Sequence, residues 1–69
     1  MSFKFDLDWE TSESAGAGGM FQVISIKDDD NNDVTGQYKI NPGKHYSNLE
    51  EVVEDMGLNP TTVDYEEDV

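Results

Sequence analysis

The sequence predicts a small α+β fold in which a three-stranded antiparallel meander is packed by one helix. Three observations lead to this fold: an alternating apolar and polar segment at the start, two further β-rich segments separated by turn residues, and one capped helical stripe near the end. A chain of 69 residues is expected to form a single domain over 1–69. Chains of this size bury only roughly 60% of their unfolded surface, so the core must be small.

The first strand is expected at about 2–10. There FKFDLDWE alternates between large apolar residues and mostly acidic ones, and a period of two is typical of a half-buried strand. The apolar side ends at Trp9, which is expected to close the core or anchor an interface. The Gly-, Ala- and Ser-rich residues 11–19 then predict a flexible connection.

The second and third strands are expected at 20–27 and 33–40. MFQVISIK carries apolar residues on both faces, which indicates a central strand. DVTGQYKI follows after the acidic stretch 28–33, so the two strands are expected to form a hairpin with that stretch at its tip.

The helix is expected at about 48–56. Its apolar stripe has the spacing i, i+3, i+4, i+7 and consists of Leu49, Val52, Val53 and Met56. Ser47 and Glu50 have the spacing of a capping box, and Gly57 has the position of a C-terminal stop. A helix this short covers less apolar surface than the sheet offers.

The remaining residues are expected to close the core and then become a tail. Thr, Val and Tyr favour a short fourth strand at 61–65, and 66–69 is expected to be a flexible acidic tail. Leu58, Val63 and Tyr65 would cover what the helix leaves open. The alternative is an open apolar patch for a partner or a second copy, although we expect a monomer rather than a homodimer.

Charge is the most informative property of the composition. Sixteen acidic residues against four lysines and no arginine give a net charge of −12. Direct binding to nucleic acid or to an anionic membrane is therefore disfavoured, whereas basic partners and cations are attracted. No segment approaches the ~18 apolar residues of a membrane span, and the start lacks a signal-peptide pattern, so we expect a cytoplasmic protein.

The acidic stretch 28–33 matches only part of the pattern of a calcium-binding EF-hand loop. Asp28, Asp30 and Asn32 fit the first, third and fifth positions of such a loop. However, Asp33 occupies the sixth position, which requires glycine, and Lys39 the twelfth, which requires glutamate. We therefore expect a polar hairpin tip and no cofactor, and a calcium-responsive module remains an alternative hypothesis.

No catalytic motif is present in the sequence. His45 is the sole histidine and has no triad spacing, so it is expected to be a surface residue and the protein is not expected to be an enzyme. The chain also has no cysteine and hence no thiolate zinc site.

The carboxylates form clusters whose spacing resembles that of phosphates. Side chains at i and i+2 of a strand repeat every ~6.7 Å, and DNA carries one charge per ~3.4 Å of each strand. Ordered carboxylates from several elements can thus imitate a phosphate array, and the alternative is a merely acidic surface. The candidate residues for a partner-binding acidic surface are Asp6, Asp8, Glu10, Asp28, Asp29, Asp30, Asp33, Glu50, Glu51, Glu54 and Asp55.

The segments DLDWE, DDDNND, LEEVVED and DYEEDV, in a short chain without cysteine, resemble those of small acidic phage-encoded inhibitors of the DNA-mimic and anti-CRISPR type. The resemblance implies a basic nucleic-acid-binding protein as partner, such as a CRISPR-Cas subunit or a nuclease. It also implies action in the cytoplasm of a host bacterial cell. An assembly module that dimerises through its sheet is a further hypothesis.

Overall fold

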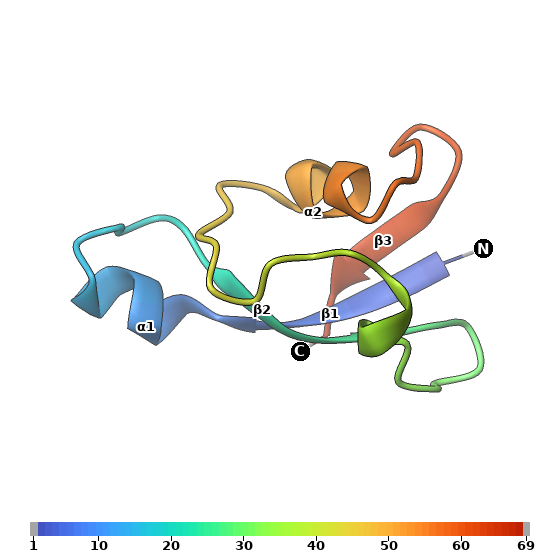
Figure 1. Ribbon diagram of the computed structural model, residues 1–69, viewed down its shortest axis with the longest axis horizontal. Helices are drawn as coiled ribbons and strands as arrows, with labels where there is room; N and C mark the ends of the chain where they lie inside the picture. Colours follow the sequence, from blue (N-terminus) through green and yellow to red (C-terminus); the bar gives the residue numbers. More distant parts are fainter. Residues whose placement is uncertain (1, 69) are drawn as a thin grey trace.

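The computed structural model describes residues 2–68 as a small α+β fold with a mixed three-stranded sheet and one main helix (Figure 1). The elements in chain order are β1 (Ser2–Asp8), α1 (Trp9–Ser14), β2 (Gln22–Lys27), the 3₁₀ turn η1 (Thr35–Gln37), α2 (Leu49–Asp55) and β3 (Asp64–Glu67). α2 lies over the sheet, whereas α1 extends at one end of the long axis (Figure 1).

The strand order is β2-β1-β3, which corrects the expected antiparallel meander. β1 is central; it pairs antiparallel with β2 and parallel with β3. The third strand therefore comes from 64–67 and not from 33–40. β2 returns the chain to the end of the sheet where β1 begins, and the connection that contains α2 then carries it to the opposite edge, where β3 runs parallel to β1.

An irregularity in β2 explains why its apolar residues seemed to lie on both faces. Asp6 pairs with Ser25 but Leu7 pairs with Val23, so Ile24 is left as an extra residue. Such a bulge shifts the alternation by one, and Val23 and Ile26 are both buried as a result. Ile24 is 56% exposed, and β2 is an edge strand with one buried face, not the expected central strand.

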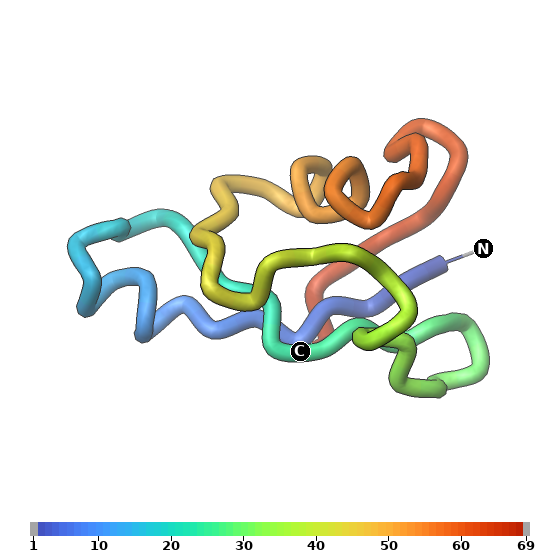
Figure 2. Tube along the Cα trace, viewed as in Figure 1, coloured from blue at the N-terminus to red at the C-terminus, as the bar shows by residue number. Residues whose placement is uncertain are grey.

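Segment 33–40 forms no strand, contrary to the prediction. After a single bridge between Lys27 and Asp33, the Asp33 carboxylate accepts a hydrogen bond from the Thr35 N–H at 2.9 Å, which favours a turn over a ladder. Residues 38–46, which we call the crossing segment, then run back along the sheet towards α1 (Figure 2). There Tyr46 forms an isolated antiparallel bridge with Phe21.

The expected helix is confirmed as α2, but its N-cap is Asn48 and not Ser47. The Asn48 side chain accepts from the Glu51 N–H at 2.9 Å, and the Glu51 carboxylate accepts from the Ser47 N–H at 2.9 Å. At the other end Gly57 has a φ of 84°, the left-handed conformation that glycine adopts without a Cβ penalty.

The core lies between the sheet and the layer formed by α2 and the crossing segment. Its buried apolar residues are Phe3, Phe5, Phe21, Val23, Ile26, Val34, Tyr46, Val52, Val53 and Met56. Leu58, Val63 and Tyr65 pack against this core, as expected. Within residues 2–68 the exposed large hydrophobic side chains are Trp9 and Ile24, so no extended apolar patch is left open.

The end of the predicted first strand and both ends of the predicted last strand are corrected. β1 ends at Asp8, whose side chain caps α1 by accepting from the Thr11 N–H at 3.0 Å, so the expected flexible connection begins with a helical turn and a half. The short strand expected at 61–65 is β3 at Asp64–Glu67, so Glu66 and Glu67 lie in the sheet and not in a tail. Val69, also expected in the tail, lies outside the described residues.

Candidate functional site

The candidate carboxylates are spread around the molecule and do not converge on one face. The 28–33 turn and α1 lie at opposite ends of the long axis, and α2 lies above the sheet between them (Figure 1). The candidates from the expected first strand are divided in the same way, because Asp6 lies on the sheet whereas Glu10 lies in α1.

The outer sheet face, which we define as the side of the sheet away from α2, has mixed charge. Lys4 lies there between its strand partners Lys27 and Glu66. Asp6 shares this face, since side chains two residues apart on a strand point the same way. Asp6, whose strand partner is Ser25, therefore shares this face with lysines as well as carboxylates and is not part of a purely acidic strip.

The turn at 28–33 is closed by its own side chains. The Asp28 carboxylate accepts from the N–H groups of Asp30 at 2.9 Å and Asn32 at 3.0 Å, and Asn31 has a left-handed φ of 63°. The expected polar chain reversal is present, with one bridge in place of a full hairpin ladder. Within the described part of the chain no three His, Cys, Asp or Glu side chains gather to hold a metal ion.

Asp29 and Asp33 are also held by hydrogen bonds at this end of the molecule. The Ser2 hydroxyl and the Ser2 N–H donate to Asp29 and hold the pKa of its carboxyl below the ordinary value. The Thr35 hydroxyl and N–H lower the pKa of Asp33 in the same way. Hydrogen bonds that favour the charged form keep these carboxylates ionised.

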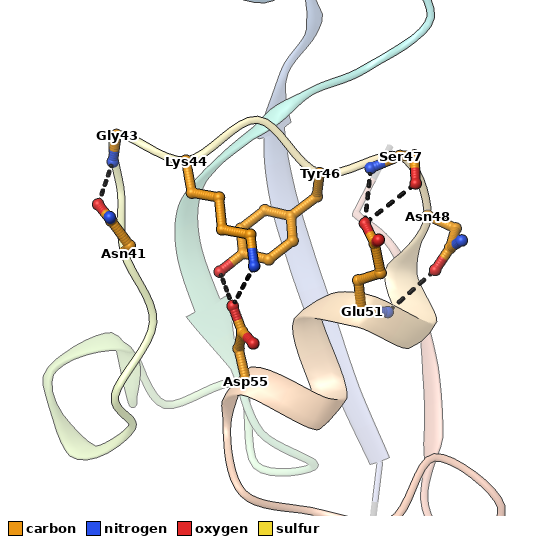
Figure 3. Close-up of polar contacts among 8 residues, drawn as sticks. All are labelled: Asn41, Gly43, Lys44, Tyr46, Ser47, Asn48, Glu51 and Asp55. Atoms are coloured by element: carbon orange, nitrogen blue, oxygen red, sulfur yellow. Dashed lines mark hydrogen bonds and ion pairs between the residues drawn. The ribbon is translucent and has the colours of Figure 1, made fainter.

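The carboxylates of α2 divide into two pairs. Glu51 and Asp55, one turn apart, point towards the segment that precedes the helix (Figure 3). Glu50 and Glu54, also one turn apart, are exposed and have no hydrogen-bond partner among residues 2–68. Only the second pair is fully available to a partner.

Asp55 joins α2 to the crossing segment. It accepts from the Tyr46 hydroxyl at 2.8 Å and from Lys44 Nζ at 3.0 Å, and Nζ lies 4.9 Å from the centre of the Tyr46 ring (Figure 3). The Tyr46 hydroxyl, followed by Lys44, lowers the pKa of the Asp55 carboxyl. Burial, and then the bond to Asp55, raises the pKa of Tyr46 to about 12.

Six of the eleven candidate carboxylates thus accept hydrogen bonds from the protein itself: Asp8, Asp28, Asp29, Asp33, Glu51 and Asp55. The other five are Asp6, Glu10, Asp30, Glu50 and Glu54, which accept none among the described residues. The first group provides fixed charges that also stabilise turns and helix ends. The second group can bind an external partner without first breaking a hydrogen bond within the protein.

The structure brings together residues that sequence spacing did not connect. The Ser12 hydroxyl, which is completely buried, lies 2.7 Å from Nδ1 of the half-buried His45 and so joins α1 to the crossing segment. His45 is therefore not the free surface residue that was expected. Because Ser12 is inaccessible, the pair is a structural link and not a nucleophile with its base.

A second unexpected link joins α1 to the last strand. Trp9 Nε1 donates to the Glu67 carboxylate at 2.9 Å, and the Trp9 ring lies 4.9 Å from that of Phe21. No motif in the sequence connects residues 58 positions apart. Trp9 is nevertheless 43% exposed, so the expected anchor position remains accessible.

Comparisons with protein-family models, with curated proteins and with solved structures gave no match to this chain. Within residues 2–68 neither helix has the length and apolar character needed to cross a membrane.

Proposed function

We propose that the protein is a non-enzymatic inhibitor that occupies a basic nucleic-acid-binding surface, such as that of a CRISPR effector complex in a host bacterial cell. The observation that carries this proposal is the density of its charge. A net charge of −12 spread along a long axis of 33 Å amounts to about one negative charge per 3 Å of axis. Duplex DNA has one charge per ~1.7 Å of axis and a single strand one per ~3.4 Å.

The order of the carboxylates supports the same function. A mimic of a stiff phosphate backbone requires charges in fixed positions, because ordering flexible side chains on binding costs conformational entropy. The hydrogen bonds to Asp8, Asp29 and Asp33 fix these carboxylates and lower their pKa values. These three carboxylates therefore stay charged well below neutral pH.

The distribution of the charge favours a channel over a flat surface as the target. Carboxylates occur at both ends of the long axis and on α2, and the body is about 21 × 20 Å across. CRISPR effector complexes of the Cas9 type hold their guide–target duplex in a positively charged channel. Such a channel can contact acidic groups on several sides of an inhibitor at once.

The test is displacement of fluorescent target DNA from a panel of guide-loaded CRISPR effector complexes at 50 mM salt. The wild type is compared with a variant in which the five free carboxylates become amides: D6N, E10Q, D30N, E50Q and E54Q. The variant keeps all six hydrogen-bonded carboxylates, and its net charge falls from −12 to −7. We expect the wild type to displace DNA from at least one complex and the variant to be at least tenfold weaker. Failure with every complex, or equal potency of the variant, would refute the proposal.

A further inference from the structure

The outer edge of β3 is an open strand edge. β3 lies at the margin of the sheet and pairs with β1 on one side only. On the opposite margin, the outer side of β2 is partly covered by bridges to Tyr46 and Asp33. Within residues 2–68, no bridge or backbone hydrogen bond covers the outer side of β3.

The hydrogen-bond pattern between β1 and β3 identifies which backbone groups of β3 are free. The Asp68 N–H donates to the Phe5 C=O at 2.8 Å, so the even-numbered residues of this segment direct their backbone groups towards β1. The N–H and C=O groups of Tyr65 and Glu67 therefore point away from the sheet. These four groups form a short template for an added strand.

The surroundings of this edge determine what kind of strand it fits. The exposed side chains of Asp64 and Glu66 flank it on the outer sheet face. They also line a hollow of about 300 Å³ together with Ser2 and Tyr65. Two carboxylates beside a hollow at a strand edge are complementary to Lys or Arg side chains of an incoming strand.

We propose that the edge of β3 binds an extended basic segment of the partner as an added strand, with its Lys or Arg side chains beside Asp64 and Glu66. This inference specifies how the partner docks. It rests on the proposed function in one respect, which is that the partner is basic. Backbone hydrogen bonds supply affinity in such strand addition, and alternate side chains supply specificity.

A second copy of the chain is a poorer occupant. Pairing two β3 strands would place Asp64, Glu66 and Glu67 of one copy close to the same residues of the other. Like charges on adjacent strands are destabilising. The acidic side chains thus protect the edge from self-association and leave it open to strands of opposite charge.

The experiment uses ¹⁵N-labelled protein and a capped Lys-Val-Lys-Val-Lys peptide. Two control peptides have the same charge but carry N-methyl groups on either the valines or the inner lysine. We expect the parent peptide to shift the amide signals of 64–67 and one methylated peptide to bind at least fivefold more weakly. In an antiparallel added strand the valines lie opposite Tyr65 and Glu67 and direct their N–H groups to β3, so weaker binding with N-methyl valine indicates that orientation. In a parallel added strand the lysine N–H groups face β3, so weaker binding with N-methyl lysine indicates the parallel orientation.

Matched protein variants test the same edge from the other side. Glu67→Pro removes an outward N–H without removing a bond to β1, and Glu67→Ala loses the same carboxylate but keeps that N–H. We expect at least fivefold weaker peptide binding by the proline variant than by the alanine variant. If Glu67→Pro fails to fold, the methylated peptides still decide the question on the wild-type protein.

The inference is overturned if all three peptides bind equally, or if shifts spread over every acidic cluster without preference for 64–67. Either result would leave DNA displacement by the intact protein unaffected, so the two proposals fail separately. Displacement without edge binding would indicate charge mimicry alone.

Discussion

Replacing Tyr46 by phenylalanine should destabilise the protein by removing the hydroxyl that joins the crossing segment to α2. The hydroxyl donates to Asp55 at 2.8 Å, and the Tyr46 side chain is completely buried. Hydrogen bonds to charged groups contribute about 1.5–3 kcal/mol. Asp55 keeps Lys44 and is 35% exposed, so we expect a loss at the lower end of that range, about 1.5 kcal/mol.

The assay is thermal and denaturant unfolding at pH 7. For a domain of this size, 1 kcal/mol corresponds to about 4–8 °C, so the Tm of Tyr46→Phe should fall by about 6–12 °C. Asp55→Asn and the double variant complete a cycle that isolates the pair. The coupling free energy should exceed the ~0.5 kcal/mol within which independent changes add.

The same substitution should change how stability depends on alkaline pH. The pKa of Tyr46 is about 12 when folded and 10.0 ordinarily, so its stabilising effect is complete below pH 10 and is lost as the pH rises through 12. The full loss corresponds to about 3 kcal/mol, more than the bond to Asp55 contributes at pH 7, because burial also disfavours the phenolate in the folded state. From below pH 10 to above pH 12 the wild type should therefore lose about that much more stability than Tyr46→Phe. Deprotonation of the lysines affects both proteins equally, because both contain all four.

Tyr38→Phe is the matched control, because Tyr38 is only half-buried and its hydroxyl has no hydrogen bond among the described residues. Its Tm should change by no more than ~4 °C, corresponding to ~0.5 kcal/mol for a surface change. A coupling near zero between Tyr46 and Asp55, or an alkaline loss of stability in Tyr46→Phe as large as in the wild type, would refute the assigned link.

Three further predictions concern charge, backbone and capping. Raising the salt from 50 mM to 1 M should increase the Tm, because the net charge of −12 repels itself and the screening length shortens to ~3 Å; an unchanged Tm would contradict this. Gly57→Ala should lower the unfolding free energy by about 1 kcal/mol because of its φ of 84°, whereas Gly36→Ala should cost less, because Gly36 has no positive φ and a Cβ meets open space at both sites; equal losses would argue against the assigned helix end. The pKa of Asp8 lies below 3.8 because the Thr11 hydroxyl and N–H bond to its carboxylate, so its contribution to stability is present above that pH and lost as the pH falls; a carboxyl ¹³C titration with a midpoint at or above 3.8 would exclude the cap.

Local patterns predicted the parts of the fold that depend on neighbouring residues. The alternation in β1 and the stripe of α2 both became buried faces, because one strand face or one helix stripe is readable from spacing alone. The end of α2 at Gly57 was also predicted, since a left-handed residue favours glycine. These features require no knowledge of distant contacts.

The sheet topology could not be predicted in the same way. The bulge at Ile24 reversed the alternation of β2, and a single extra residue leaves no mark in composition. The parallel partner of β1 lies 62 positions away, at Tyr65 against Phe3, and long-range pairing of this kind depends on tertiary packing. Segment 33–40 had strand-forming residues, but the side-chain bonds of Asp33 turned the chain away.

The candidate acidic surface was predicted by residue type but not by arrangement. Residue type and spacing placed all eleven candidate carboxylates on one acidic surface, whereas the structure separates carboxylates such as Asp55, which stabilise the fold, from carboxylates such as Glu54, which are free. The same side-chain chemistry serves both roles, so only the positions of the donors distinguish them. The links from Ser12 to His45 and from Trp9 to Glu67 had no signal in the sequence.

The most direct test of phosphate mimicry is the salt dependence of inhibition. Target DNA bound to a guide-loaded CRISPR effector complex is titrated with the wild-type protein between 50 and 300 mM salt. Phosphate mimicry predicts complete displacement at low salt and an inhibition constant that weakens steeply and log-linearly as salt rises, as for nucleic acid itself. DNA that stays bound at saturating inhibitor across the panel, or inhibition that does not change with salt, would contradict it.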